Sequence, residues 1–315
     1  MAMLTALCAV LEKDQLFCIH INHNLRSAEE TKNDGELVLN FCKEQGIKCC
    51  IETIPPGKIT AFAKKKGTGI EAAARFFRRR AFFKEAARLG DNTFILTAHT
   101  KDDLLEQSLM RILRGAGPAG LAVMPVRNKR LIRPLLSISR AEIINYLNNK
   151  NIPWREDSSN TDEKFLRNRI RRRLVPLLNE SFPSWKTGLS AMAETQALAA
   201  EFIIEEAGRL IKWNKNKPQS FTEGGNSEDF LSANAQDFFA QPLIIREESL
   251  FLAVDELLKG TKNSRTVKRS SIRRFCAGAK TADLGPVQVK QKDGNILLLH
   301  SKKDFFECGV SRLIK

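Results

Sequence analysis

The first half of the chain alternates short apolar runs with longer segments of helical periodicity. The apolar runs predict strands at residues 15–21, 48–54 and 92–97. The periodic segments predict helices at residues 1–11, 28–42, 69–88, 102–113 and 139–150. The connections between the strands are long enough for parallel crossovers. This order is typical of an α/β domain, and we predict a doubly wound parallel sheet.

The pattern changes in the second half, where helical periodicity dominates. Residues 188–213 predict a long helix, residues 214–228 a polar loop, and residues 247–258 a further helix. Near the end, two apolar runs flank Asp293-Gly294, which is a strong signal for a β-hairpin. We therefore predict two domains, residues 1–184 and residues 185–315, the second mostly helical and ending in a small hairpin.

Composition sets the outer limits on the class of protein. The 315 residues are 43% hydrophobic and 28% charged, as in ordinary globular proteins of about two domains. No apolar run approaches the ~20 residues that span a bilayer, and the N-terminal segment lacks a basic region, so we expect a cytoplasmic protein that does not contact membranes. The seven cysteines are odd in number and include no Cys-x-x-Cys pair, which indicates neither a disulfide framework nor a zinc site.

The charge balance is strongly basic. Lysine and arginine number 51 against 36 acidic residues, a net charge of +15, and the excess is concentrated at residues 64–66, 78–80 and 167–173. Nucleic acid is the natural partner of such a surface, because the planar arginine fork suits phosphate. A solvated helix face and a membrane surface are the alternatives that charge alone leaves open.

Candidate chemistry follows the predicted strand at residues 92–97. His99, Asp102, Asp103 and Glu106 stand at a junction between strand and helix, and the carboxyl ends of strands are where open α/β sheets bind ligands. Asp103 and Glu106 share a helix face and together can hold an amine. In the alternative interpretation Asp102 caps the helix, Glu106 completes the cap or pairs on a solvated face, and His99 is structural.

Five separated segments resemble the tRNA(Ile)-lysidine synthases of the N-type ATP pyrophosphatase, or PP-loop, superfamily. They are residues 20–26 (His-Ile-Asn-His-Asn-Leu-Arg), 71–78 (Glu-Ala-Ala-Ala-Arg-Phe-Phe-Arg), 97–115 from Thr97-Ala98-His99 to Gly115, 133–136 (Arg-Pro-Leu-Leu), and 157–160 (Asp-Ser-Ser-Asn) leading to 167–171 (Arg-Asn-Arg-Ile-Arg). Each segment is weak alone, whereas five in this order are hard to produce by chance. The residues from 185 onward resemble the tRNA-binding C-terminal region of the family only loosely.

The resemblance implies a two-step reaction. ATP adenylates the C2 oxygen of the wobble cytidine in an isoleucine tRNA with a CAU anticodon, and the ε-amine of free lysine then displaces AMP. The product, lysidine, changes decoding from AUG to AUA. The implied substrates and cofactors are therefore ATP, Mg²⁺, free L-lysine and tRNA(Ile). The sequence is also compatible with a homodimer.

The resemblance also assigns expected roles to particular residues. The expected catalytic residues are His99, Asp103, Glu106, Arg75 and Arg78. The expected nucleotide-binding residues are Asn22, His23, Thr97 and Ala98. The expected tRNA-binding residues are Arg26, Arg111, Arg114, Arg133, Arg167, Asn168 and Arg169. In the alternative interpretation, some of these arginines only pair with Asp157, Asp162 or Glu163. No metal ligand is identified, since His20 and His23 without a third ligand make a poor zinc site.

One family feature is missing from the sequence. The phosphate-binding loop Ser-Gly-Gly-x-Asp-Ser, expected after a first strand, does not occur, and residues 1–7 look like the helix that should follow it. We expect that the recorded start lies inside a longer reading frame, and the alternative is a truncated copy that binds tRNA without catalysis. A PP-loop thiolase is a third hypothesis, but Cys49-Cys50 has no suitable partner spacing.

Overall fold

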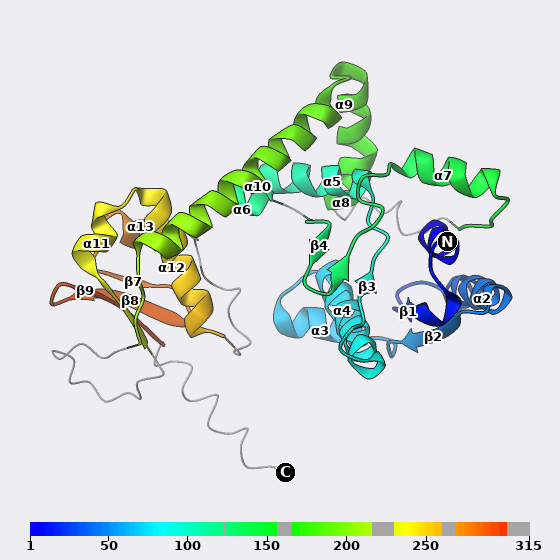
Figure 1. Cartoon of the computed structure of the whole chain (residues 1–315), viewed down its shortest axis with the longest axis horizontal. Helices are drawn as coiled ribbons and strands as arrows, with labels where there is room; N and C mark the ends of the chain where they lie inside the picture. Colours follow the sequence, from blue (N-terminus) through cyan, green and yellow to red (C-terminus); the bar gives the residue numbers. More distant parts are fainter. Residues whose placement is uncertain (123, 156–165, 216–229, 260–266, 268, 301–315) are drawn as a thin grey trace, which may run out of the picture. The chain divides into compact units, whose positions relative to one another are not determined.

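The computed structural model describes residues 1–122, 124–155, 166–215, 230–259, 267 and 269–300. The chain divides into two compact units, Met1–Glu194 and Thr195–Lys315 (Figure 1). The division falls inside the long helix α10 (Trp185–Leu210), which begins at the first residue of the predicted second domain. The exact domain boundary stays a prediction.

The first unit contains parallel strands, as predicted. Its strands are β1 (Phe17–Asn22), β2 (Lys48–Thr53), β3 (Ile95–Leu96), β4 (Arg127–Asn128) and β5 (Leu131–Ile132). β1 pairs in parallel with β2, and β3 pairs in parallel with β5, while β4 joins β5 in antiparallel orientation. These parallel pairings confirm the α/β class. The strand predicted at residues 92–97 is regular over two residues only.

Helices cover these strands and connect them. The helical segments of the first unit are α1 (Ala2–Cys8), η1 (Lys13–Gln15), α2 (Ala28–Gln45), α3 (Lys58–Lys66), α4 (Ile70–Leu89), α5 (Lys101–Ile112), α6 (Pro118–Leu121), α7 (Arg140–Asn149), α8 (Leu166–Arg169), η3 (Ile170–Leu174) and α9 (Val175–Ser181). α2 packs against β1 and β2, α3 packs against α4, and α4 contacts β1 and β3. α4 therefore lies beside the end of β1, where the candidate residues are.

Helix ends explain where two of these elements begin. The Ser27 hydroxyl accepts a hydrogen bond from the Glu30 N–H at 3.3 Å and starts α2, as predicted. Thr100, and not Asp102, caps α5, because the Asp103 carboxylate accepts the Thr100 N–H at 2.8 Å while the Thr100 hydroxyl accepts the Asp103 N–H at 3.3 Å. The interpretation of Asp102 as the cap is wrong.

The arginine-rich segment forms one helical run with a change of pitch in the middle. The α-helical turn of α8 passes into η3, which has π-helical geometry, and then into α9. Single-turn π segments occur often at functional sites, because they re-aim side chains that a regular helix would space differently. Here the wider turn carries Arg171.

The second unit is an antiparallel sheet with helices on it. Its strands are β6 (Phe230–Asn234), β7 (Thr281–Asp283), β8 (Val287–Lys292) and β9 (Asn295–His300), in the order β6-β9-β8-β7, and its helices are α11 (Ala235–Ala240), α12 (Leu243–Leu257), α13 (Arg269–Cys276) and part of α10. Fully buried Phe238, Leu250 and Phe275 form part of its core. The predicted hairpin is confirmed: Asp293 (φ 49°) and Gly294 (φ 72°) both adopt the left-handed conformation of a tight turn between β8 and β9.

Some elements were not predicted. α3 follows the segment Ile54-Pro55-Pro56-Gly57 after β2, and β4 with β5 forms a very short ribbon. Most of the predicted loop at residues 214–228 lies outside the described residues, but Asn214 makes a β-bridge with Ser232 instead of starting a loop. No helix in the described part of the chain is both long enough and apolar enough to cross a membrane.

Candidate functional site

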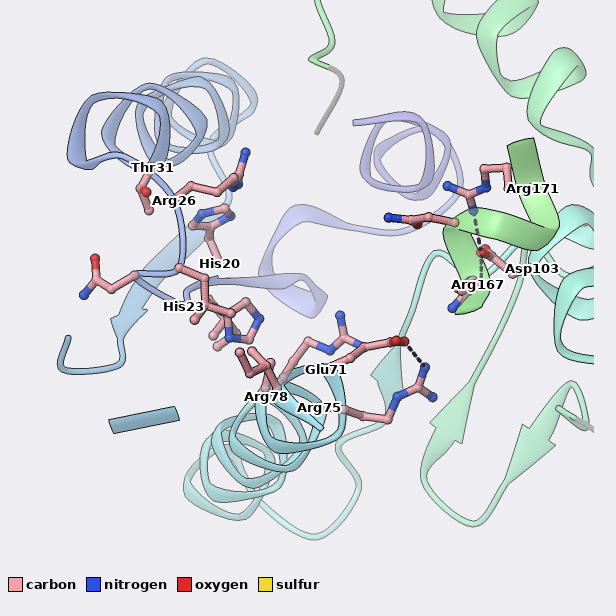
Figure 2. Close-up of a pocket in the computed structure, with 16 residues that line it drawn as sticks. His20, His23, Arg26, Thr31, Glu71, Arg75, Arg78, Asp103, Arg167 and Arg171 are labelled. Carbon is pink, nitrogen blue, oxygen red and sulfur yellow. Dashed lines mark hydrogen bonds and ion pairs between the residues drawn. The ribbon is translucent and has the colours of Figure 1, made fainter. Parts of the chain in front are cut away.

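A cavity of about 600 Å³ lies in the first unit, where several of the resembling segments meet. Side chains from β1, the following loop, α2, α4, α5, α8 and η3 surround it (Figure 2). The lining residues are His20, Ile21, His23, Asn24, Leu25, Arg26, Thr31, Ile70, Glu71, Ala74, Arg75, Arg78, Asp103, Arg167, Asn168 and Arg171. The fold thus brings together residues that are far apart in the chain, from His20 to Arg171.

Seven of the expected site residues line this cavity. They are His23, Arg26, Arg75, Arg78, Asp103, Arg167 and Asn168. Sequence reasoning gave no role to Glu71 and Arg171, which also line it. Both lie inside resembling segments. Glu71 is four residues before Arg75, and Arg171 is four residues after Arg167, so each shares a helix face with an expected site residue, and this spacing could have identified them.

The cavity is rich in positive charge. Five lining arginines face two lining carboxylates, those of Glu71 and Asp103. Burial lowers the pKa of the Arg78 guanidinium, and the nearby charges of Arg75 and Arg167 lower it further. Arg75 is only loosely held by Glu71, at 4.0 Å. Because these cations repel one another, an anion placed among them would be stabilised.

Two arginines and two acids form a compact cluster at one wall of the cavity. The Arg167 guanidinium contacts the Asp103 carboxylate at 2.5 Å and the Glu106 carboxylate at 2.8 Å. Arg171 donates to both oxygens of Glu106, at 2.6 Å and 3.0 Å. Burial would lower the pKa of Arg171, but the hydrogen bond and charge of Glu106 outweigh it and raise that pKa.

This cluster changes what Asp103 and Glu106 can do. The Glu106 side chain is 5% exposed and does not line the cavity, whereas the Asp103 side chain is 21% exposed and does. The alternative in which Glu106 sits on a solvated face is wrong, since its carboxylate is buried against two guanidinium groups. Both carboxylates are therefore already paired with arginine, and of the two only Asp103 also faces the cavity.

His99 lies beside the cavity lining as a neutral imidazole. Its Nδ1 is 2.9 Å from the Thr97 hydroxyl. Burial lowers the pKa of His99 to about 4, against the opposing charge of Asp103. Neither His99, Thr97 nor the exposed Ala98 lines the cavity. Asn22 ends β1 and accepts the Asn24 N–H at 2.8 Å, so it shapes the loop that leads into the cavity.

The remaining expected tRNA-binding arginines lie away from the cavity lining. Arg111, Arg114 and Arg169 are exposed, and half-buried Arg133 donates to the Pro125 carbonyl at 2.6 Å. Arg26, which does line the cavity, contacts Asp34 at 2.6 Å. The alternative partners Asp157, Asp162 and Glu163 lie outside the described residues.

The described acidic and histidine side chains of the cavity do not make a protein-held metal site. Over the described residues, the group of three or more ligand side chains close enough to share an ion consists of cysteines, none of which lines the cavity. His20 and His23 line it without a third such ligand. The expected Mg²⁺ is therefore not explained by these residues alone.

Comparison with known proteins identifies the relatives of this chain. The family described as PP-loop domain matches residues 1–178. The tRNA(Ile)-lysidine synthase of Treponema denticola is 42% identical over 207 residues, 65% of this chain and 44% of that protein. The enzyme of the same name from Treponema pallidum (strain Nichols) is 30% identical over 89% of this chain and 58% of that protein. The one from Shouchella clausii is 34% identical over 94% of this chain and 64% of that protein.

The chain spans about half the length of the curated relatives it matches. The PP-loop match, in contrast, covers more than half of this chain and includes every residue that lines the cavity. This protein therefore belongs to the PP-loop domain family.

Proposed function

We propose that this chain carries the reaction site of a tRNA(Ile)-lysidine synthase, which uses ATP to attach lysine to the wobble cytidine of an isoleucine tRNA. The observation that carries the proposal is the convergence of four of the resembling segments on one arginine-rich cavity. The names of the relatives support the reaction, and the geometry supports the place where it occurs.

The arginines of α4 are suited to the phosphate chemistry of the first step. Arg75 and Arg78 stand one helical turn apart and both line the cavity. Adenylation of the cytidine C2 oxygen releases diphosphate, so negative charge develops near the α-phosphate and on the leaving group. Guanidinium groups fixed in a half-buried site stabilise such charge more than solvent does. Mg²⁺ would then enter with the nucleotide phosphates.

Asp103 is the residue best placed to receive the lysine ε-amine in the second step. Its carboxylate faces the cavity and already binds cations, with the Arg167 guanidinium at 2.5 Å and that of Arg171 at 3.8 Å. Glu106 takes the different role of holding Arg167 and Arg171 from behind. The amine then attacks C2 of the adenylated base, the bond to AMP breaks, and a nearby base removes the proton from nitrogen. His99, which is neutral at physiological pH, is the candidate base that accepts this proton.

The exposed arginines are suited to the tRNA rather than to the reacting atoms. Arg111, Arg114 and Arg169 present charge on the surface of the first unit, where phosphate contacts need no burial. We propose that the second unit, which begins within α10, also contacts the tRNA. Its own sequence lies beyond the PP-loop match, and its charge is basic on balance, with 19 lysines and arginines against 15 acidic residues over 195–315.

The test is the chemical identity of the nucleoside made. An isoleucine tRNA with a CAU anticodon is incubated with ATP, Mg²⁺, labelled lysine and either this chain or a version extended upstream in frame. The tRNA is then digested and position 34 is identified by mass. A nucleoside heavier by lysine minus water supports the proposal, whereas a tRNA with a GAU anticodon should stay unmodified.

Two other results would contradict the proposal. Sulfur in place of the C2 oxygen would identify a thiolase. Tight tRNA binding with unmodified cytidine in both forms of the protein would identify a binding protein without catalysis.

A further inference from the structure

Three cysteine side chains of the first unit meet outside the arginine-rich cavity. Cys18 on β1 and Cys49 on β2 are register partners in the parallel pair, and Cys42 comes from the last turn of α2, which packs on both strands. Their three sulfur atoms all lie within 4.8 Å of one another. The sequence gives no Cys-x-x-Cys signal here, because the fold and not the spacing brings the three together.

The surroundings of this group are apolar. Leu16 and Ile47 are buried beside Cys42, which is 1% exposed, and Leu4 and Leu7 of α1 pack against them. Burial raises the pKa of the Cys49 thiol to about 11, and it also raises the pKa of Cys18. Without an ion, Cys18 and Cys49 are therefore neutral thiols, and all three cysteines pack as small apolar side chains.

We propose that Cys18, Cys42 and Cys49 form a three-sulfur site for a soft, thiophilic metal or metalloid ion. Thiolate ligands select soft ions. Zn²⁺ is a poorer candidate because its structural sites take four ligands, and the group found among the described residues has three. Three thiolates around a trivalent ion make a neutral complex, which an apolar site accommodates at the lowest cost.

Arsenite is the probe that matches this geometry and charge. Arsenous acid, As(OH)₃, reacts with three thiols to give one tris-thiolate and three water molecules, without any change of oxidation state. Three As–O bonds break, three As–S bonds form, and the thiol protons leave in the water. The bound ion would join β1, β2 and α2, and should therefore stabilise the folded chain.

The first measurement is the intact mass of the folded chain after incubation with arsenite and a phosphine reductant. The proposal predicts a gain of one arsenic atom with the loss of three hydrogen atoms per chain. Binding by two sulfurs would retain one hydroxide on arsenic and give a different mass. That mass, or no gain at all, would overturn the proposal without any variant being made.

Matched variants then locate the site. Cys49→Ala should abolish the three-sulfur adduct and the arsenite-dependent rise in melting temperature. Cys50→Ala is the control, because the adjacent side chain points to the other face of β2 and its sulfur is not in the group. Loss of the adduct in Cys50→Ala, or its survival in Cys49→Ala, would contradict the assignment. Cys18→Ala serves as a second variant if Cys49→Ala does not fold.

Discussion

At the scale of single residues, Glu106 illustrates how a buried charge is tolerated in the first unit. Its carboxylate is almost fully enclosed, and both oxygens accept hydrogen bonds from Arg171 while Arg167 contacts one of them. A buried ion pair adds little net stability compared with apolar packing, but removal of one partner leaves the other charges unpaired. Glu106 is therefore a structural requirement of the cavity wall as well as a neighbour of the site.

The substitution Glu106→Gln should accordingly destabilise the first unit by about 3 kcal/mol, since two guanidinium groups would lose their buried counter-charge. Urea-induced unfolding measures this change. The matched control is Glu206→Gln, which removes an exposed ion pair with Arg209 on α10 and should leave the unfolding midpoint unchanged. Equal midpoints for the two variants would show that the Glu106 cluster is not formed.

His99 makes the stability depend on pH in a defined direction. Its pKa in the folded chain is about 4, below the ordinary value of 6.5, so between these values the unfolded chain binds more protons. Stability should therefore fall as pH falls from 6.5 to 4. Relative to His99→Gln, the wild type should lose about 2 kcal/mol over this interval, allowing for partial exposure. Parallel stability profiles for the two proteins would mean that His99 titrates normally.

The residues of the candidate site were predicted in part, whereas their partners were not. The resemblance to the family pointed to Arg75, Arg78, Asp103 and Arg167, which line the cavity, and also to His99 and Glu106, which do not. The ion pairs between Asp103 and Arg167 join positions 64 residues apart, and no local pattern encodes such a contact. The sequence suggested that Asp103 and Glu106 together hold an amine. In the structure both carboxylates contact the Arg167 guanidinium instead.

At the scale of elements, the strongest predictions came from local conformational rules. The Ser27 cap and the Asp293-Gly294 hairpin were predicted because their chemistry is decided within a few residues. β3 and the pair β4–β5 were predicted poorly, since strands of two residues carry no periodicity and depend on pairing with distant partners. The π-helical turn at η3 has no sequence signature at all.

Two glycines, one in the hairpin turn and one in a helix, should respond to alanine substitution with stability changes of opposite sign. Gly294 has φ +72° with open space around the position of an added Cβ, so Gly294→Ala should cost about 1 kcal/mol from backbone strain alone. Gly188 lies in helix α10, also with open space, and Gly188→Ala should stabilise by about 0.5–1 kcal/mol. Thermal unfolding of both variants measures these two changes in stability. A stabilising Gly294→Ala would contradict the turn geometry.

At the scale of the whole molecule, the net charge of +15 indicates how the chain would bind tRNA. Exposed arginines that contact phosphate release counterions, so each contributes to the salt dependence of affinity. Arg169→Ala should weaken tRNA binding and reduce the slope of log affinity against log salt by about 1. A filter-binding titration at several salt concentrations measures the slope. An unchanged slope would assign Arg169 a structural role.

The arginine-rich cavity is the place where we propose that lysine is joined to tRNA. The most direct test compares Arg78→Gln with Arg88→Gln on the same helix, since Arg88 does not line the cavity and pairs with Glu85 at the surface. Labelled lysine incorporation into tRNA(Ile) is measured with the form of the protein that shows activity. We expect a rate about 100-fold lower for Arg78→Gln and a normal rate for Arg88→Gln. Equal rates for both variants would place the reaction elsewhere.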